Sequence, residues 1–523
     1  MSNKGLIIDS SFFGKWGGKA LTNLLAGIDI GTTGLKVSFY TEHGLMVDRS
    51  YREYALSLPQ DAYVEFDPHL WWSHVCDALQ EIFSRGKVKA EKVKGIGITC
   101  TNALIIMDAE QQILRPAIMQ LDQRATTQVH QLIEQLGHEW IFLKTGNRIA
   151  SGAFWGPTLL WLKQHEPLTF DRIRYYLVPT SFLGFCLTGV YSIDHSRASS
   201  TMLYNIYDRR WDNELCQLFS IQPKFLPSIY SSSEVIGFVH AEAAMRTGLQ
   251  PGTPVIAGAM DTIGAWVGLG VEPGSGALIM GTVGRICVEN EHLDLRFMNT
   301  VQDAASPTIS MTPVNSAGIS MKWLKRVLFS DHPVNGIYEV MDRMAEPIQR
   351  GAEGLMYVPY LTGERSPIWD PQANGSFLGL QLKHQKAHFI RAVLEGVGFA
   401  LAHNDGILKE ECGINPSYLY AGGGGARSRL WMQIISDILG KRLLIPGELE
   451  TETKGAAMLA GVGVGLFSDL ASLRKKWVGM EMQIIPEPDA HSFYLKALPI
   501  FKEYYINNKE LLWRWKQLQM SHP

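Results

Sequence analysis

Two short segments of the chain carry the same Gly-Thr-x-Gly turn between runs of apolar and β-branched residues: Ile28–Val37 (IDIGTTGLKV) and Leu278–Val288 (LIMGTVGRICV). This pattern is typical of two strands joined by a tight turn. Thr32 and Thr282, one in each turn, are separated by about half of the 523-residue chain. Glycine lets the backbone approach a ligand closely, and the threonine hydroxyl and neighbouring N–H groups present donors to an anion. The sequence therefore predicts a duplicated fold that grips a polyphosphate from both sides of a cleft.

Strands and helices alternate on both sides of a Pro- and Gly-rich stretch near 251–276, which predicts an α/β architecture in two halves. We divide the chain into an N-terminal extension (1–23), two domains (24–267 and 268–508) and a C-terminal helix end and tail (509–523). In the first half we expect a hairpin, an amphipathic helix, two strands and a helix, at Leu24–Phe39, Pro68–Ser84, Val93–Thr99, Leu104–Asp108 and Asp122–Leu136. In the second half we expect strands at Met356–Pro359 and Tyr418–Ala421 and helices at His388–Leu408, Trp431–Leu439, Gly455–Gly465 and Ser492–Gln517.

The composition disfavours polyanionic and membrane partners. The 48 Lys and Arg residues against 51 Asp and Glu residues give a net charge of −3, so no overall field would recruit nucleic acid or an anionic membrane surface. The six cysteines form no C-x-x-C pair, which favours reduced thiols in a cytosolic protein. The most apolar window, Tyr175–Tyr191, is too short and interrupted to span a bilayer, and the first residues lack the apolar run of a signal peptide. We therefore expect a soluble, cytoplasmic protein.

Asp29 stands just before the first Gly-Thr turn. A carboxylate at this position can hold a Mg²⁺ ion that is bound to a nucleotide, often through water, and so offset the charge of the phosphates. The alternative is a turn aspartate that caps its own loop. Thr32, Thr33 and Lys36 nearby favour the metal role. Lys36 itself is either a phosphate contact or a solvated strand lysine.

Asp261 follows the apolar strand expected at Val255–Ala259 and precedes the helix expected at Thr262–Leu269. Its side chain should therefore lie at the carboxyl end of a strand, where open α/β sheets bind their ligands. A carboxylate there can accept the proton of a hydroxyl that attacks a γ-phosphate. The structural alternative is a helix N-cap, a position that favours Asp. The location of Asp261 between the two phosphate turns favours the catalytic role.

Four consecutive glycines, Gly422–Gly425, precede Ala426, Arg427 and Ser428 in a predicted strand-to-helix turn. The absence of side chains lets an adenine ring or a ribose lie against the backbone, although the spacing is not the G-x-G-x-x-G of dinucleotide-binding folds. The chain has no HExxH motif or Cys/His cluster, which disfavours a zinc site, and no G-x-S-x-G, which disfavours an α/β-hydrolase.

An acid and an arginine stand together at Asp122 and Arg124, and again at Glu364 and Arg365. Such a pair can hydrogen-bond several hydroxyls of a polyol, while an exposed pair at a helix start is the structural alternative. Arg124 can also bind a carboxylate bidentately, which keeps an aldonic acid such as gluconate among the substrates considered.

Thr101, Asn102, Asp122 and Arg124 all fall in loops after strands of the first half, on the side toward which Asp261 should project. We therefore expect the acceptor substrate to bind at these four residues and Asp261. Near the C-terminus, Trp513 and Trp515 in ELLWRWKQLQM are expected to pack on a partner or on the chain's own domain.

The segment Gly375–Glu395 (GSFLGLQLKHQKAHFIRAVLE) resembles the C-terminal signature of the FGGY carbohydrate kinases, from its small-x-apolar-x-Gly-aliphatic start to the His-aromatic pair and the closing Ala-Val-Leu-Glu. The resemblance extends from about Leu25 to about Tyr505. These kinases are relatives of the actin/hexokinase-type ATPases. The resemblance implies two ribonuclease-H-like domains around a central cleft, the N-terminal one binding sugar and the C-terminal one binding nucleotide.

The resemblance also implies ATP and Mg²⁺ as cofactors and assigns roles to individual residues. Asp261 matches the catalytic base, and Asp29 is the residue that would hold the metal. The residues implied in nucleotide binding are Asp29, Thr32, Thr33 and Lys36 in the first phosphate motif, Gly281 and Thr282 in the second, Gly318 against the phosphates, and Gly424 and Gly425, with Ser428 beside them, at the adenosine. Kinases of this family are often dimers, so a homodimer is a candidate assembly.

The sugar half departs from the family pattern. Pro157 is followed by Thr158 where the family usually has lysine, and Cys100–Ala103 (CTNA) stand where xylulokinases usually have Gln-Met-His-Gly. Leu121 occupies a position that is often Trp or Asn. By contrast, TPVNSAGISMKWL and LKHQKAHFIRAVLEGV resemble gluconokinases more than xylulokinases. The substrate is therefore left open among small open-chain sugars, sugar acids and polyols.

We predict an ATP- and Mg²⁺-dependent kinase that phosphorylates a hydroxyl of such a molecule. An actin-like switch ATPase that binds a protein partner is the alternative, because it would share both phosphate turns. A switch would not need Asp261 together with the pair Asp122 and Arg124. An inactive sugar sensor is disfavoured, since Asp29, Thr32, Thr282 and Asp261 are all present.

Overall fold

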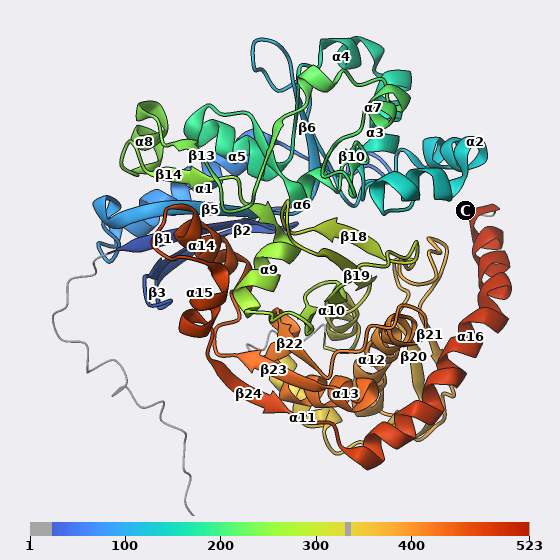
Figure 1. Ribbon diagram of the computed structural model, residues 1–523. Helices are drawn as coiled ribbons and strands as arrows, with labels where there is room; N and C mark the ends of the chain where they lie inside the picture. Colours follow the sequence, from blue (N-terminus) through green and yellow to red (C-terminus); the bar gives the residue numbers. More distant parts are fainter. Residues whose placement is uncertain (1–22, 330–335, 522–523) are drawn as a thin grey trace, which may run out of the picture.

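The computed structural model describes residues 23–329 and 336–521, and its strands form one large sheet in each half of the chain (Figure 1). The predicted extension 1–23 therefore lies, apart from Asn23, outside the described residues. The first sheet has the order β13-β14-β5-β1-β2-β3, with β15 also paired to β5. Its strands are β1 (Leu24–Ile30), β2 (Gly34–Thr41), β3 (Met46–Glu53), β5 (Val93–Cys100), β13 (Val235–Phe238), β14 (Pro254–Ile256) and β15 (Ala259–Met260).

The second sheet has the order β18-β19-β17-β16-β22-β23-β24. Its strands are β16 (Gly276–Met280), β17 (Gly284–Glu289), β18 (Met298–Val301), β19 (Thr308–Val314), β22 (Tyr418–Gly422), β23 (Arg442–Pro446) and β24 (Met480–Ile484). In both sheets an antiparallel meander is followed by two parallel strands and an antiparallel edge strand. The order β3-β2-β1-β5-β14-β13 thus corresponds to β19-β17-β16-β22-β23-β24, which confirms the predicted two-domain α/β fold.

Helices cover the faces of both sheets (Figure 1). Those of the first half are α1 (Pro68–Ser84), α2 (Thr126–Thr145), α3 (Trp155–His165), α4 (Pro167–Arg172), α5 (Pro179–Thr188), α6 (His195–Ala198), α7 (Asn213–Leu218), α8 (Ala241–Thr247) and α9 (Asp261–Leu269). Those of the second half are α10 (Gly318–Leu328), α11 (Ile337–Ala345), α12 (Lys386–Glu410), α13 (Arg429–Leu439), α14 (Thr451–Gly463), α15 (Leu470–Trp477) and α16 (Pro488–Ser521).

Short strands complete the structure. A four-stranded sheet contains β4 (Glu65–Phe66), β7 (Ala117–Met119), β6 (Ala103–Met107) and β8 (Tyr175–Leu177). Three strand pairs are β9 (Ser192–Asp194) with β12 (Ser228–Tyr230), β10 (Tyr204–Asn205) with β11 (Arg210–Trp211), and β20 (Met356–Val358) with β21 (Ser376–Leu378).

Local sequence explains where some helices begin and end. α1 has the predicted bounds, because Asp67 accepts a hydrogen bond from the His69 N–H at 2.9 Å and Pro68 occupies the first helical position. The helix predicted at 122–136 starts too early, since α2 begins only at Thr126, whereas its predicted end falls just before a kink in α2 at Gly137. Before it, the Asp122 N–H donates to the Met119 carbonyl at 3.0 Å in a turn.

Two helices, α9 and α14, cross each other with their backbones in contact. A Cβ atom on Gly268 would lie 1.9 Å from the Thr451 carbonyl oxygen, and a Cβ on Gly455 would lie 1.9 Å from the Gly264 carbonyl oxygen. Both distances are far below van der Waals contact, so this crossing requires glycine. Buried apolar side chains of α9 and α14 form one cluster with residues of β1, β16 and β22, and this cluster joins the two sheets.

α14 lies on the first sheet although it follows the second sheet in the sequence. A Cβ atom on Gly27 of β1 would lie 1.8 Å from the Thr453 carbonyl oxygen, and a Cβ on Gly97 of β5 would lie 2.0 Å from that of Ala456. Figure 1 shows α14 beside β1. A helix from the segment 268–508 is therefore part of the packing of the first half.

Several general expectations can be compared with the structure. The six cysteines are all unpaired. Within residues 23–329 and 336–521, no helix combines the length and the apolar character that crossing a membrane requires. Of the two C-terminal tryptophans, Trp513 packs on the chain's own domain by donating to Asp370, whereas the exposed fraction of Trp515 is 64%.

Candidate active site

The first Gly-Thr turn joins β1 to β2. The Gly31 N–H donates to the Gly34 carbonyl at 2.9 Å and closes the turn, with Thr32 and Thr33 at its tip. Thr33 is exposed, while the Thr32 hydroxyl lies 3.4 Å from the hydroxyl of Thr101, which follows β5. The turn is thus tied to the neighbouring strand end, and its hydroxyls lie at the edge of the sheet.

The second Gly-Thr turn joins β16 to β17 and supports the start of α10. The Gly281 N–H donates to the Val283 carbonyl at 3.1 Å, which leaves Thr282 exposed at the tip. The Gly318 and Ile319 N–H groups donate to the carbonyls of Gly281 and Thr282 at 3.1 and 3.2 Å. A Cβ on Gly318 would lie 2.4 Å from the Gly281 oxygen, so only glycine allows this approach. The positive end of the α10 dipole therefore lies beside the turn.

Asp29 stands opposite Lys36 of β2 and Thr99 of β5, and its carboxylate accepts from the Thr99 hydroxyl at 2.9 Å. Burial, together with the negative charges of Glu452 and Asp261, raises the pKa of Asp29 to about 7 against the opposing effect of Lys36. Carboxylates from β1, α9 and α14 thus gather at one end of the first sheet. Their combined negative potential favours a divalent cation.

Lys36 is bound in an ion pair and is therefore not a solvated strand lysine. Its Nζ lies 3.0 Å from Glu450, which also pairs with Arg49 at 2.9 Å. Burial alone would lower the pKa of Lys36, but Glu452, Asp29 and Glu450 together raise it. The lysine remains cationic beside Asp29, at the base of the first turn.

Asp261 begins α9 directly after β15, where Met260 stands opposite Cys100 at the end of β5. Met260 occupies the N-cap position and Asp261 is the first helical residue, so the N-cap alternative for Asp261 is wrong. One carboxylate oxygen of Asp261 accepts from the Thr262 N–H at 2.7 Å. The exposed fraction of the side chain is 24%, which leaves the carboxylate accessible at the carboxyl end of the sheet.

Arg197 contacts Asp261, although the sequence did not single it out. Asp194 caps α6 by accepting from the Ser196 and Arg197 N–H groups at 2.8 and 3.2 Å. The Arg197 guanidinium, 2% exposed, donates to the Cys100 carbonyl and lies 3.5 Å from Asp261. Its Nε–H is buried and has no partner among the described residues. A buried donor of this kind is usually satisfied by water or a ligand.

Thr101 and Asn102 follow β5 at the same edge of the sheet. The Thr101 N–H donates to the Ile30 carbonyl at 2.8 Å, and the Asn102 side-chain amide donates to the Ala153 carbonyl at 2.8 Å. The Asn102 Oδ1 and, two residues after Ala153, the Trp155 Nε1 are both buried without a partner in the described part of the chain. This edge therefore presents an acceptor and a donor to a polar ligand.

Asp122 and Arg124 form a buried ion pair, not an exposed pair at a helix start. The Asp122 carboxylate accepts from Arg124 Nε and Nη2 at 2.9 and 2.8 Å and from the Val64 N–H at 2.7 Å. Arg124 also donates to Glu65 at 2.6 Å, and its guanidinium lies over the Tyr63 ring at 4.0 Å. Most of the hydrogen-bonding capacity of this pair is thus used inside the protein, and Arg124 Nη1 is buried without a partner in the region described.

The glycine run after β22 leaves backbone uncovered beside the second turn. A Cβ atom on Gly424 would meet no atom within 4 Å, while a Cβ on Gly425 would lie 2.9 Å from Met280. This open backbone has room for a flat ring. The Ser428 hydroxyl caps α13 by accepting from the Trp431 N–H at 3.0 Å, so the structure gives Ser428 a local role at the helix start.

Glu364 and Arg365 pack against the segment that precedes α10. The Asn315 N–H donates to Glu364 at 2.9 Å, and Arg365 Nε donates to the Asn315 side chain at 2.6 Å. Burial raises the pKa of Glu364 to about 8 and lowers that of Arg365 to about 10. Because Asn315 lies three residues before Gly318, this pair is connected to the second turn.

Models of the N-terminal and C-terminal domains of the FGGY family of carbohydrate kinases match residues 24–268 and 278–464. The chain belongs to this family. Xylulose kinase of Bacillus subtilis is 30% identical over 93% of this chain and 97% of that protein, and gluconokinase of the same species is 29% identical over 94% and 96%. The crystal structure of ligand-bound xylulose kinase from Lactobacillus acidophilus covers 93% of this chain and 98% of its own, with a TM-score of 0.86 and 26% identity.

As an FGGY carbohydrate kinase the protein is a phosphotransferase, and kinases of this family use ATP and act on small sugars. The residues around Asp29 fit a magnesium ion that arrives with the nucleotide. The negative charges of Glu452 and Asp261 lie close enough to this buried carboxylate to raise its pKa, and a divalent cation would offset them. No group of three His, Cys, Asp or Glu residues in 23–329 and 336–521 is placed to hold a metal. Phosphate oxygens and water would therefore complete the coordination of such an ion.

The sequence pointed to both turns and to Asp261 in this kinase but missed Arg197, Glu450 and Glu452. Glu450 and Glu452 reach the first turn only because α14 packs on the first sheet. For Arg197, the Asp-x-Ser-Arg spacing indicates a capped helix start, but nothing local connects it with Asp261. These residues could be recognised only from long-range contacts.

Proposed function

We propose that this kinase transfers the γ-phosphoryl group of Mg²⁺-bound ATP to a hydroxyl of a small open-chain sugar, sugar acid or polyol. The observation that carries the proposal is the position of Asp261, which is accessible at the carboxyl end of the first sheet and close enough to Asp29 to raise its pKa. A carboxylate at the seam between two phosphate-binding turns suits a general base better than a structural cap.

In this mechanism Asp261 orients the acceptor hydroxyl and takes its proton as the oxygen attacks the γ-phosphorus. Arg197 holds the Asp261 carboxylate toward the strand ends, at 3.5 Å. Thr32 and Thr282 bind phosphate oxygens from the two sides of the cleft, and Asp29 is the residue that would hold the metal. The magnesium ion would neutralise charge that develops on the phosphates. Domain closure excludes water, which otherwise would accept the phosphoryl group.

Unpartnered buried groups support the location of the acceptor near the end of β5. Asn102 Oδ1, Trp155 Nε1 and Arg197 Nε all lack partners among the described residues, and hydroxyls or a carboxylate of the substrate would satisfy them. Two of these groups, Trp155 Nε1 and Arg197 Nε, are donors and only Asn102 Oδ1 is an acceptor, so they suit a ligand rich in oxygen acceptors. Relatives named xylulose kinase and gluconokinase are similar to this chain to nearly the same degree, so we propose a pentulose or an aldonate as the substrate class.

A panel of pentuloses, gluconate, other aldonates and polyols in an assay that couples ADP release to NADH oxidation tests the proposal. We expect sugar-dependent ADP release with one member of the panel. Asp261→Asn should lower kcat by about 10²–10⁴-fold, the usual contribution of a general base, and leave ATP binding intact. Asp489→Asn, at an exposed position of α16, is the matched control. Wild-type turnover by Asp261→Asn, or ATP hydrolysis that ignores every sugar, would contradict the proposal.

A further inference from the structure

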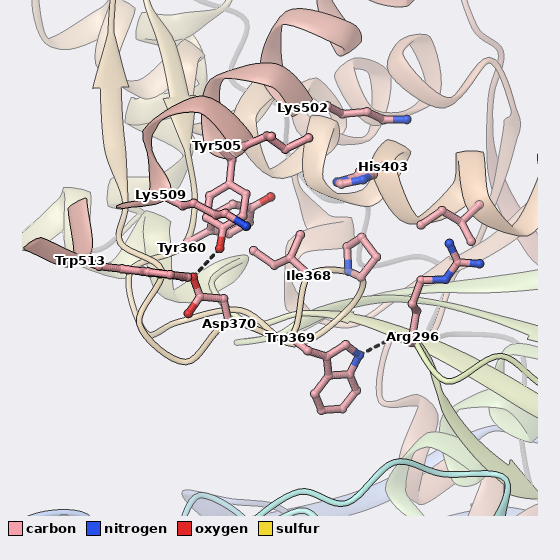
Figure 2. A pocket seen from close by; sticks show the side chains of 13 residues that line it. Arg296, Tyr360, Ile368, Trp369, Asp370, His403, Lys502, Tyr505, Lys509 and Trp513 are labelled. Atoms are coloured by element: carbon pink, nitrogen blue, oxygen red, sulfur yellow. Dashed lines mark hydrogen bonds between the residues drawn. The ribbon is translucent and has the colours of Figure 1, made fainter. Parts of the chain in front are cut away.

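A cavity of about 460 Å³ lies between α16, α12 and the loop 366–370, and its lining residues include none of those assigned to the active site (Figure 2). Its volume falls within the range of small-molecule sites. Aromatic rings form much of its wall, namely Tyr360, Trp369, Tyr505 and Trp513. The Tyr360 and Tyr505 rings meet edge to face, with their centroids 5.3 Å apart. The cavity therefore offers apolar ring surface to a planar ligand.

The charge at this cavity is positive. Lys502 and Lys509 lie two turns apart on one face of α16, and neither forms an ion pair with a carboxylate in the part of the chain that the structure describes. The third cation, Arg296, is already paired with Asp294 and Glu411 at 2.5 and 2.7 Å. The two lysines are therefore the groups with charge to offer a ligand.

Of the remaining ionisable groups in the lining, only the Asp370 carboxylate offsets part of the charge of the two lysines. Burial, together with Lys502 and Arg296, lowers the pKa of His403 to about 4, so this ring is neutral near pH 7. The carboxylate of Asp370 accepts from the Tyr505 hydroxyl and, at 2.9 Å, from Trp513 Nε1. Figure 2 shows this acid at the wall formed by α16, where its hydrogen bonds fix the loop to the helix.

We propose that this cavity binds a small aromatic anion, with its ring among the aromatic side chains and its negative charge attracted by Lys502 and Lys509. Inorganic anions lack the ring and neutral aromatics lack the charge, so both should bind more weakly. The proposal concerns a site separate from the kinase centre, and binding there does not require the proposed phosphoryl transfer to be correct.

The loop that forms one wall of the cavity also reaches the kinase centre. The backbones of Asp370 and Glu364 exchange two hydrogen bonds of 2.9 Å, and Glu364 accepts from Asn315, which precedes α10 and the second phosphate turn. On its other side the Trp369 ring lies 4.5 Å from the guanidinium of Arg148, a residue of the first domain. A ligand that shifts this loop would therefore act on both the phosphate turn and the contact between domains. We expect occupancy to change the KM for ATP.

Phenyl phosphate titrated into the full-length protein, with saturating ADP present to block the nucleotide site, tests binding by calorimetry. Wild type should bind phenyl phosphate and benzoate more tightly than inorganic phosphate or phenol. The double variant Lys502→Gln/Lys509→Gln should lose about tenfold or more in affinity, because it removes both positive charges that attract the anion. Lys496→Gln, exposed on the same helix, is the matched control and should bind as wild type does. Equal affinity for phenyl phosphate in the double variant and the control, or no binding by wild type, would refute the proposal that this cavity is an anion site.

Coupling is tested with the same proteins in the ADP-release assay. Phenyl phosphate should change the KM for ATP in wild type and Lys496→Gln but not in the double variant. By linkage, phenyl phosphate should change the Kd for ATP, and ATP the Kd for phenyl phosphate, by the same factor. An unchanged KM in wild type at saturating phenyl phosphate would refute the connection to the phosphate turn. If phenyl phosphate still inhibits the double variant competitively with ATP, it acts at the nucleotide site, and the connection between the cavity and the phosphate turn is refuted as well.

Discussion

Replacing Gly268 by alanine should reduce both stability and turnover, because this glycine allows α9 and α14 to touch. The new Cβ would lie 1.9 Å from the Thr451 carbonyl oxygen, whereas real Cβ contacts are essentially never shorter than 3.0 Å. The two helices must therefore separate by roughly 1 Å, and neither neighbour can yield by a side-chain rotation, since the clash is with backbone. Overpacking of this kind costs about 1–3 kcal/mol, which exceeds the roughly 1 kcal/mol that alanine gains in helix propensity.

The same displacement reaches the active site. α9 carries Asp261 at its first position, and α14 carries Glu452 at its second. A shift of about 1 Å in the reacting groups lowers a rate by roughly 10²-fold. We therefore expect the kcat of Gly268→Ala to fall about 10- to 100-fold, with a thermal midpoint several degrees lower.

Thermal unfolding and the ADP-release assay measure the two effects on the same preparation. Gly479→Ala is the matched control, because a Cβ at Gly479 would meet no atom within 4 Å, and it should behave as wild type. A Gly268→Ala protein with an unchanged thermal midpoint and an unchanged kcat would refute the argument that this crossing is closely packed and positions Asp261.

Substitutions at three further positions test other parts of the site. Arg197→Met removes the cation 3.5 Å from Asp261 and should lower kcat roughly 10- to 100-fold with the KM for ATP unchanged. Arg197→Lys should recover part of the loss. Equal kcat values in wild type and both variants would exclude a role of Arg197 in positioning Asp261. Gly318→Ala places a Cβ 2.4 Å from the Gly281 oxygen, which should push α10 away from the second turn and raise the KM for ATP about tenfold, whereas an unchanged KM would separate α10 from phosphate binding. Glu364 has a pKa of about 8 in the folded protein against an ordinary value of 4.5, so the folded state binds more protons between these values and stability should fall as pH rises from about 4.5 to 8. Glu364→Gln should remove at most about 5 kcal/mol of this dependence, seen as a flatter plot of thermal midpoint against pH; parallel plots for both proteins would contradict it.

Local patterns in the sequence were sufficient for the elements whose bounds depend on neighbouring residues. The hairpins around Thr32 and Thr282 and the helix α1 could be predicted, because strand alternation, glycine turns and an Asp-Pro start act over a few residues. The start of α2 was wrong by four residues, since Asp122 precedes the helix and accepts from the Val64 N–H, a contact between residues far apart in the chain that no local pattern encodes.

In the candidate site, too, some residues could be predicted from local sequence and others depend on long-range contacts. Asp29 and Asp261 were found from their positions beside a turn and after a strand. The burial and pairing of Asp122 and Arg124 depend on Glu65 and Tyr63, which lie about 60 residues earlier in the chain. The ion pair of Lys36 with Glu450 was not predicted, because it forms only where α14 crosses to the first sheet.

By itself the sequence determined that the chain repeats one strand–turn–strand unit, with Asp29 just before the first turn and Asp261 directly after a strand. These features depend on residue type and short spacing. Only the tertiary structure decided that α14 returns to the first sheet, that Arg197 meets Asp261, and that α16 closes a cationic cavity over the loop 366–370. These contacts join residues far apart in the chain. Their geometry follows from how the helices and sheets pack, which no local pattern specifies.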